Sequence, residues 1–207
     1  GEKELAECIY GLRRAESGRI LLFGEDATKL DIFRIKKKGV AFISDDRIRD
    51  GIIPDASVED NLTIGSEDNF SYFKRIFINT EKRKALAENL VKEFSILVKN
   101  LRAPIITLSG GNMQRVYLAR AMGGHVRLLI ALHPTVGLDP MGTKIFFDKV
   151  NARRIRNLTT IIISPNVKEL MAFCDRISVM SGGRIIGTFK PEEVTVERLG
   201  LMVSGVA

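Results

Sequence analysis

A serine and two glycines, Ser109-Gly110-Gly111, directly precede a segment with apolar residues at helical spacing, including Val116 and Met122. The first amides of a helix have no partner inside the helix, and the helix dipole adds positive potential at the same end. Because glycine has no Cβ, the backbone there can approach a ligand closely. A helix that begins here is therefore suited to binding phosphate oxygens. On these three residues alone, an ordinary helix with a serine in its first turn would be the preferred interpretation.

The longer string Leu-Ser-Gly-Gly-Asn-x-Gln-Arg, residues 108–115, narrows the interpretation. It resembles the signature motif of ABC-type ATPases, in the Asn-containing form of sugar and nucleoside importers. In that family two cassettes face each other head to tail, and each ATP lies between the Walker A loop of one cassette and the signature helix of the other. The resemblance implies that this chain contacts an ATP held by a second cassette. The residues implied are Ser109, Gly110, Gly111, Asn112 and Gln114.

The stretch from Leu128 to Asp139 looks like the Walker B strand and D-loop of the same family. In active members this strand ends Asp-Glu-Pro-Thr, where the aspartate holds Mg²⁺ through water and the glutamate polarises the attacking water. Leu132 and His133 stand at those two positions. A leucine cannot help to bind a hard cation that requires oxygen ligands. The D-loop aspartate, Asp139, is retained.

The first residues, Gly1-Glu2-Lys3-Glu4, resemble the end of a Walker A loop running into its helix. The working motif continues with a lysine and a Ser or Thr, which hold the β/γ-phosphates and Mg²⁺. This register places Glu2 at the lysine position and Lys3 at the hydroxyl position, and a carboxylate facing a triphosphate is repulsive. A shift of one residue would restore a lysine but no hydroxyl. The glycine-rich part of the loop and its strand would precede Gly1.

Two further positions depart from the family pattern. Residues 39–51 resemble the Q-loop region, with Asp45 where other branches place a glutamine that senses the γ-phosphate and metal. In isolation, a charged surface loop would explain Asp45 better. Pro165 stands where the family's switch histidine would contact the γ-phosphate. Together with Leu132 and His133, this loss predicts that the chain's own site is degenerate, holds no metal and does not hydrolyse ATP.

The composition of the chain limits the classes of partner and the compartment that we expect for it. The 207 residues carry a net charge of +7, which suits nucleotide phosphates, nucleic acid or an anionic membrane surface. The basic residues are scattered except for two short runs, 36–38 and 153–156, which we interpret as solvated faces, and no RNA-binding aromatic motif accompanies them. Cys8 and Cys174 lack a CxxC partner, which favours a reducing compartment. No apolar run approaches the ~18 residues of a membrane span.

Hydrophobic patterning predicts an α/β fold. We expect helices over 5–12, 81–99 and 144–155, strands over 19–23, 40–43, 128–132 and 159–163, and a hairpin over 176–180 and 184–188. The resemblance implies a P-loop NTPase-like ABC ATPase domain spanning 1–207: a mostly parallel sheet flanked by helices. Its N-terminal strands would be missing, and a helical subdomain of about 57–125 would be inserted in the α/β core.

The preferred interpretation is the C-terminal cassette of a tandem ATPase that powers import of nucleosides or simple sugars. The tail over 196–205 and the strand Leu-Ile-Ala-x-x-Pro-Thr favour nucleosides. ATP and Mg²⁺ would be bound mainly through the partner cassette. The expected partners are that second cassette, membrane permease subunits and, indirectly, an extracytoplasmic substrate-binding protein, but no nucleic acid. The expected location is cytoplasmic and peripheral, on the inner face of the cell membrane.

Three alternatives stay open at this point. The first is an active ATPase in which His133 replaces the catalytic glutamate. The second is a non-transport ABC protein acting on the ribosome or DNA, suggested by the basic charge but not by any coiled-coil insertion or basic tail. The third is an interaction module that no longer binds nucleotide.

Overall fold

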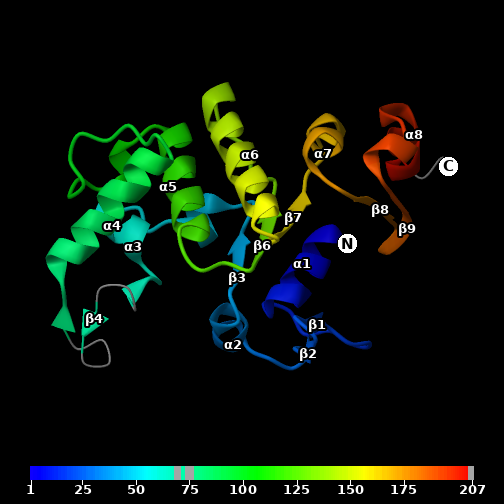
Figure 1. Cartoon of the computed structure of the whole chain (residues 1–207), viewed down its shortest axis with the longest axis horizontal. Coiled ribbons are helices and arrows are strands. Elements are labelled where there is room, and N and C mark those ends of the chain that lie inside the picture. Colours follow the sequence, from blue (N-terminus) through cyan, green and yellow to red (C-terminus); the bar gives the residue numbers. More distant parts are fainter. Residues whose placement is uncertain (68–70, 73–76, 205–207) are drawn as a thin grey trace.

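A computed structural model describes residues 1–67, 71–72 and 77–204 of the chain. Its centre is a three-stranded parallel sheet in the order β3-β6-β7, seen in the middle of Figure 1. These strands are β3 (Val40–Ile43), β6 (Leu128–Leu132) and β7 (Thr159–Ile163), with the boundaries expected from the sequence. Every residue of β6 is buried, which is typical of a parallel strand covered on both faces.

The sheet separates two hydrophobic cores, because successive side chains of a strand point to opposite faces. Leu129 and Ala131 of β6 lie in a core with α5 (Gly110–Met122) and α6 (Pro140–Ile155). The alternate residues of β6 lie in a second core with α1 (Glu2–Tyr10) and α2 (Ile32–Lys37). Helix α1 ends where Gly11 adopts a φ of 82° as its C-cap, close to the predicted end.

A helical region precedes and includes α5, on the left in Figure 1. It contains α3 (Val58–Thr63), the short strand pair β4 (Ser71–Tyr72) and β5 (Phe77–Ile78), and α4 (Thr80–Glu93). The helix expected over 81–99 ends six residues early, because Phe94 is its C-cap and Ser95 adopts a φ of 50°. Residues 68–70 and 73–76 of the expected helical stretch lie outside the described residues. Leu90 and Phe94 belong to the same hydrophobic core as Leu129, and α5 connects this region to β3 of the sheet.

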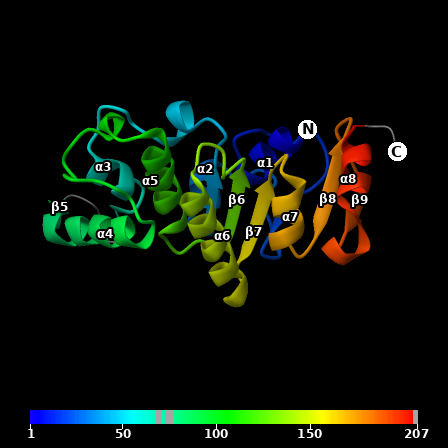
Figure 2. The same cartoon turned by 90° about the horizontal axis from the view of Figure 1, so that it is seen from above.

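The C-terminal part contains α7 (Val167–Phe173), β8 (Ile177–Ser181), β9 (Arg184–Phe189) and α8 (Val196–Val203). Strands β8 and β9 form the predicted antiparallel hairpin, and Figure 2 places it with α8 at the end of the molecule beyond α7. The last residues of the predicted tail, 205–207, lie outside the described residues. The apolar run of β7 also predicts a buried strand, and this prediction was wrong, because its residues are exposed or half-buried. Among the described strands, β7 pairs only with β6.

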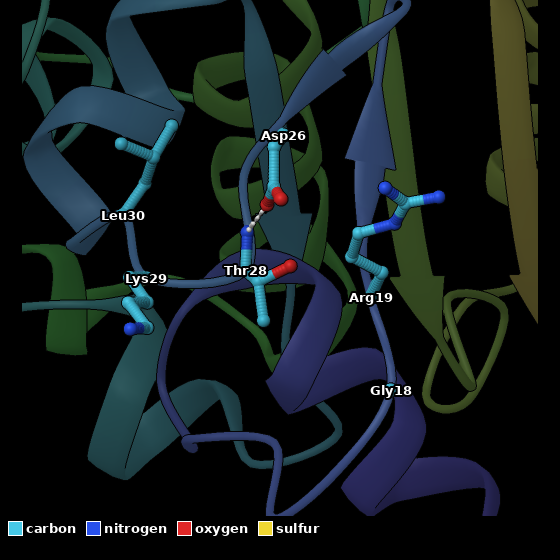
Figure 3. A pocket seen from close by; sticks show the side chains of 6 residues that line it. All are labelled: Gly18, Arg19, Asp26, Thr28, Lys29 and Leu30. Atoms are coloured by element: carbon cyan, nitrogen blue, oxygen red, sulfur yellow. Dashed lines mark hydrogen bonds between the residues drawn. The ribbon is translucent and has the colours of Figure 1, made fainter.

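Several short elements complete the chain. The strand expected over 19–23 reduces to β1 (Leu21–Leu22), which pairs with β2 (Glu25–Asp26). A pocket of about 410 Å³ lies beside this pair, where the Thr28 amide donates to Asp26 Oδ1 at 2.9 Å (Figure 3). None of its six lining residues belongs to the predicted motifs. Single turns occur at η1 (Arg47–Gly51), η3 (Ile105–Thr107) and η4 (Pro191–Glu193).

One basic residue expected at a solvated face is buried instead. Arg153 of α6 is 8% exposed and donates to the carbonyls of Val126 and Thr159, at 3.0 and 2.9 Å, and to Thr160 Oγ1 at 3.1 Å. Its guanidinium thereby satisfies the backbone where β6 and β7 begin. Among residues 1–67, 71–72 and 77–204, no helix is long and apolar enough to cross a membrane.

Candidate functional site

The N-terminus of α5 carries the predicted phosphate-binding residues. Ser109 is the N-cap, and its Oγ accepts from the amide of Asn112 at 3.4 Å and from Asn112 Nδ2 at 3.0 Å. Ser109 is exposed, and Gly110 and Gly111 are half-buried. Within the described chain, the amides of Gly110 and Gly111 donate to no acceptor. The first turn of α5 therefore offers two free N–H groups at the positive end of the helix dipole.

The other two predicted signature residues face the chain's own backbone. Asn112 Oδ1 accepts from the Leu97 amide at 2.8 Å. Gln114 is only 4% exposed, and its Nε2 donates to the Pro134 carbonyl at 3.2 Å. Gln114 thus holds the loop that follows β6 against α5, and its burial argues against the expected direct contact with a phosphate.

Asp139, the predicted D-loop residue, is fixed from two directions. It is the N-cap of α6 and accepts from the Gly142 amide at 2.7 Å. Arg115 Nη2 donates to both carboxylate oxygens, at 2.6 and 2.9 Å, while Arg115 Nη1 donates to the Ser95 carbonyl at 2.6 Å. The hydrogen bond from Arg115, followed by that from Gly142, lowers the pKa of the Asp139 carboxyl. Arg115 therefore joins the signature helix to α6, a role that the sequence interpretation missed.

The N-terminus of α1 differs in charge and in pairing. Gly1 occupies its N-cap without a side-chain cap, and Glu2 and Glu4 lie in the first turn. Lys3 Nζ donates to both oxygens of Asp45, at 2.9 and 3.1 Å. This hydrogen bond is the main cause that lowers the pKa of Asp45 and raises the pKa of Lys3. Two residues predicted for the chain's own site therefore neutralise each other.

A polar network extends from this ion pair to α5. Ser44 Oγ lies 3.3 Å from Asp45 Oδ1 and donates to Asp50 Oδ2 at 2.7 Å. The Ser44 amide donates to the hydroxyl oxygen of Tyr117 at 2.7 Å. Burial of Tyr117 raises the pKa of its hydroxyl. Tyr117 therefore connects the loop after β3 to the signature helix, a contact that the sequence analysis did not predict.

The residues at the Walker B and switch positions provide few oxygen ligands. Leu132 is 2% exposed and packs in the same core as Ala6 and Ile130. His133 is half-buried with a φ of 45°, a backbone conformation uncommon outside glycine. Pro165 is exposed in the loop between β7 and α7.

The chain is similar to curated ATP-binding proteins of import systems. It is 34% identical to "Ribose import ATP-binding protein RbsA 1" of Rubrobacter xylanophilus over 207 residues, covering 99% of this chain and 41% of that protein. It is 30% identical to "Guanosine import ATP-binding protein NupO" of Bacillus subtilis over 205 residues, covering 99% of this chain and 40% of that protein. The chain therefore spans about two fifths of the length of these relatives.

Solved structures of ATP-binding cassettes share the fold. A dimeric cassette in a post-hydrolysis state, bound to ADP and Pi, superposes with a TM-score of 0.79 at 19% identity, over 92% of this chain and 81% of that chain. A nucleotide-free cassette from an ABC transporter superposes with a TM-score of 0.72 at 23% identity, over 93% and 77% of the two chains. The expected P-loop NTPase-like α/β fold with a parallel sheet and flanking helices is confirmed.

The family assignment follows from sequence as well as fold. Residues 3–136 match the family described as "ABC transporter", which is more than half of the chain. The matched residues include Lys3, Asp45, the signature helix α5 and the start of the loop after β6. Members of this family bind ATP together with Mg²⁺. The chain belongs to the ABC transporter family and is one of its ATP-binding cassettes, related to those of ribose and nucleoside importers.

Proposed function

We propose that this chain is a cassette of an importer for nucleosides or simple sugars, and that it acts on an ATP held by a second cassette. The observation that carries the proposal is the pair of free amides at Gly110 and Gly111, next to the exposed Ser109. Oriented N–H groups stabilise the charge that develops on a transferring phosphoryl group without reorganising during the reaction. Ser109, Gly110 and Gly111 are the residues that touch the phosphate.

Asn112, Gln114 and Asp139 act as positioning residues in this proposal. Asn112 and Gln114 tie the start of α5 to the Leu97 amide and the Pro134 carbonyl. Asp139 reaches the same helix through Arg115. With three contacts from different segments, the first turn of α5 is held in one orientation, and a preorganised donor is more effective than a mobile one.

The residues of the chain's own site do not fit Mg²⁺. The position that would supply the metal aspartate is Leu132, which is buried among apolar side chains. The Asp45 carboxylate is already neutralised by the Lys3 ammonium. Within the described residues, no group of three His, Cys, Asp or Glu side chains could hold a metal ion. We infer that this site is degenerate and serves as a structural contact.

The partners and location follow from the same proposal. The chain would pair with a second cassette and dock on permease subunits at the cytoplasmic face of the membrane, with an extracytoplasmic binding protein delivering the substrate. The names of these relatives refer to ribose, guanosine and nucleosides, all of which contain a pentose. Uptake of radiolabelled ribose and guanosine by the reconstituted transporter separates the two substrate classes.

The direct test is Ser109→Arg in the full-length ATPase assembled with its permease. An arginine at this N-cap places a bulky side chain over the free amides, and loss of one such donor set lowers turnover by about 10²–10³-fold. Ser17→Arg, in an exposed loop outside the motifs, is the matched control and keeps normal turnover. Near-normal ATP turnover by Ser109→Arg rejects the proposal.

A second variant separates the proposal from an active site built on His133. Because His133 has no metal aspartate beside it, His133→Ala leaves ATP turnover unchanged in our account. Turnover abolished by His133→Ala, with folding intact by circular dichroism, favours the alternative in which this histidine replaces the catalytic glutamate.

A further inference from the structure

Arg47 lies between the signature helix and the D-loop. It is the first residue of η1, directly after the loop that carries Asp45. A Cβ added to Gly110 would lie 3.2 Å from Arg47 Nη2, and a Cβ added to Gly137 would lie 2.8 Å from Arg47 Nη1. The two glycines therefore make room for the guanidinium beside the free amides of α5.

The charge of Arg47 is not compensated within the described part of the chain. Its Nε is buried from solvent and has no hydrogen-bond acceptor. The nearby carboxylates are engaged elsewhere: Asp45 with Lys3, and Asp50 with Arg49 at 2.8 Å. Asp46 caps η1 by accepting from the Arg49 amide. Other arginines of the region are paired, as Arg115 is with Asp139.

This placement is electrostatically unfavourable without an anion. The N-terminus of α5 carries the positive end of a helix dipole, and Arg47 adds a full positive charge to the same place. A buried N–H group without an acceptor adds a further cost. An anion between Gly110 and the Arg47 Nη groups would offset the two positive charges that meet there. The planar fork of an arginine matches the oxygens of a phosphate better than any other side chain does.

We propose that Arg47 is a further phosphate-binding residue, which contacts the terminal phosphate of the ATP that the first turn of α5 receives. The proposal rests on the proposed function, because it assigns Arg47 to the same triphosphate. It implies that this cassette supplies a cation in trans, although its own site does not fit Mg²⁺. It also gives a second reason, besides the φ of 80°, why residue 137 is a glycine: a Cβ there would lie against the Arg47 guanidinium.

The test compares ATP and ADP in the full-length ATPase assembled with its permease. Arg47→Ala lowers kcat/KM for ATP by about 10²-fold, within the range for loss of one transition-state donor. Inhibition by ADP, which lacks the terminal phosphate, changes by less than about twofold. Arg47→Lys keeps the positive charge but not the two-pronged guanidinium, so its kcat/KM for ATP lies between those of Arg47→Ala and the parent protein. Arg34→Ala, an exposed arginine of α2, is the matched control.

The outcomes distinguish this inference from the proposed function. Normal kcat/KM for Arg47→Ala, while Ser109→Arg is inactive, overturns the role of Arg47 and leaves the proposed function standing. Normal values for both variants overturn both. An equal loss of ATP and ADP binding, or a lowered melting temperature with no recovery in Arg47→Lys, identifies a structural role and also overturns the inference. If Arg47→Ala does not fold, Arg47→Gln, which keeps most of the side-chain volume, is measured in the same way.

Discussion

Two helix N-termini in this molecule use the same dipole in opposite ways. Helix α5 begins with Gly110 and Gly111, whose amides are free within the described chain, and Arg47 lies beside them. Helix α1 begins with Glu2, and its Lys3 is paired with Asp45. The first turn of α5 is therefore open to an external anion, whereas that of α1 already carries its own carboxylates.

The comparison shows that a fold does not determine which of its helix ends binds a ligand. Both helices pack on the same sheet, and both begin near the carboxyl ends of its strands. The difference lies in a few side chains, since acidic residues at α1 satisfy the dipole and a leucine replaces the metal ligand. Function therefore has to be assigned to each end from its own residues.

The largest predicted effect is a loss of stability when an aspartate is introduced at the Walker B position beside α1. Leu132→Asp restores the carboxylate of the Walker B pattern but places it at a position that is 2% exposed in an apolar core. Leu132→Ala alone costs about 2–5 kcal/mol of the free energy of unfolding. Leu132→Asp costs more, because it also buries a charge. Urea unfolding of both variants measures the difference.

Melting temperatures with and without Mg²⁺ test whether the aspartate introduced by Leu132→Asp binds the metal. With Lys3 already supplying a cation to Asp45, Mg²⁺·ATP does not raise the melting temperature of Leu132→Asp above that of the same variant without metal. A metal-dependent rise in that variant would show that the α1 side still forms a magnesium site.

A smaller effect is expected on the α5 side from Gly137→Ala. A non-glycine residue in the left-handed region costs about 1–2 kcal/mol. Here the new Cβ also lies 2.8 Å from Arg47 Nη1, so the guanidinium must move. Gly18→Ala is the matched control, because Gly18 has a φ of 83° with nothing within 4 Å of the added Cβ. Chemical denaturation therefore gives a larger loss for Gly137→Ala, and equal losses contradict the position assigned to Arg47.

The smallest effect is the pH dependence of the Lys3–Asp45 pair. The pKa of Asp45 is lowered by Lys3, so its contribution to stability is present above the ordinary value of 3.8 and is lost as pH falls through the folded-state pKa. The pKa of Lys3 is raised, so its contribution is present below 10.5 and is lost as pH rises further. Lys3→Met is therefore less stable than the parent protein between these limits, and the two converge outside them. A difference in melting temperature that does not vary with pH contradicts the pairing.

The sequence was sufficient for the elements with continuous apolar runs. Strands β3, β6 and β7 have the predicted ends because glycines, charged residues or polar turns bound each run. Helices α2, α7 and α8 were missed because they have only six to eight residues and depend on caps at Asp31, Asn166 and Thr195. The pattern of their few apolar residues was too short to establish a period.

The site was predicted less completely than the fold. The contacts Lys3–Asp45 and Arg115–Asp139 join residues 42 and 24 positions apart, so no local pattern reveals them. Gln114 carried a usable signal: it lies three and four residues before Tyr117 and Leu118, on the face of α5 that packs inward. The signature motif suggested that Gln114 contacts phosphate, whereas the position of Gln114 on the helix indicated that its side chain is buried.

We propose that the first turn of α5 contacts ATP, whereas the site beside α1 neither binds Mg²⁺ nor hydrolyses ATP. Trapping of ATP with Mg²⁺ and orthovanadate in the full-length, permease-bound ATPase tests it directly, by counting tightly held nucleotide per pair of cassettes. The account predicts one trapped nucleotide per pair, lost in Ser109→Arg. Two trapped nucleotides per pair, or one that persists in Ser109→Arg, would contradict it.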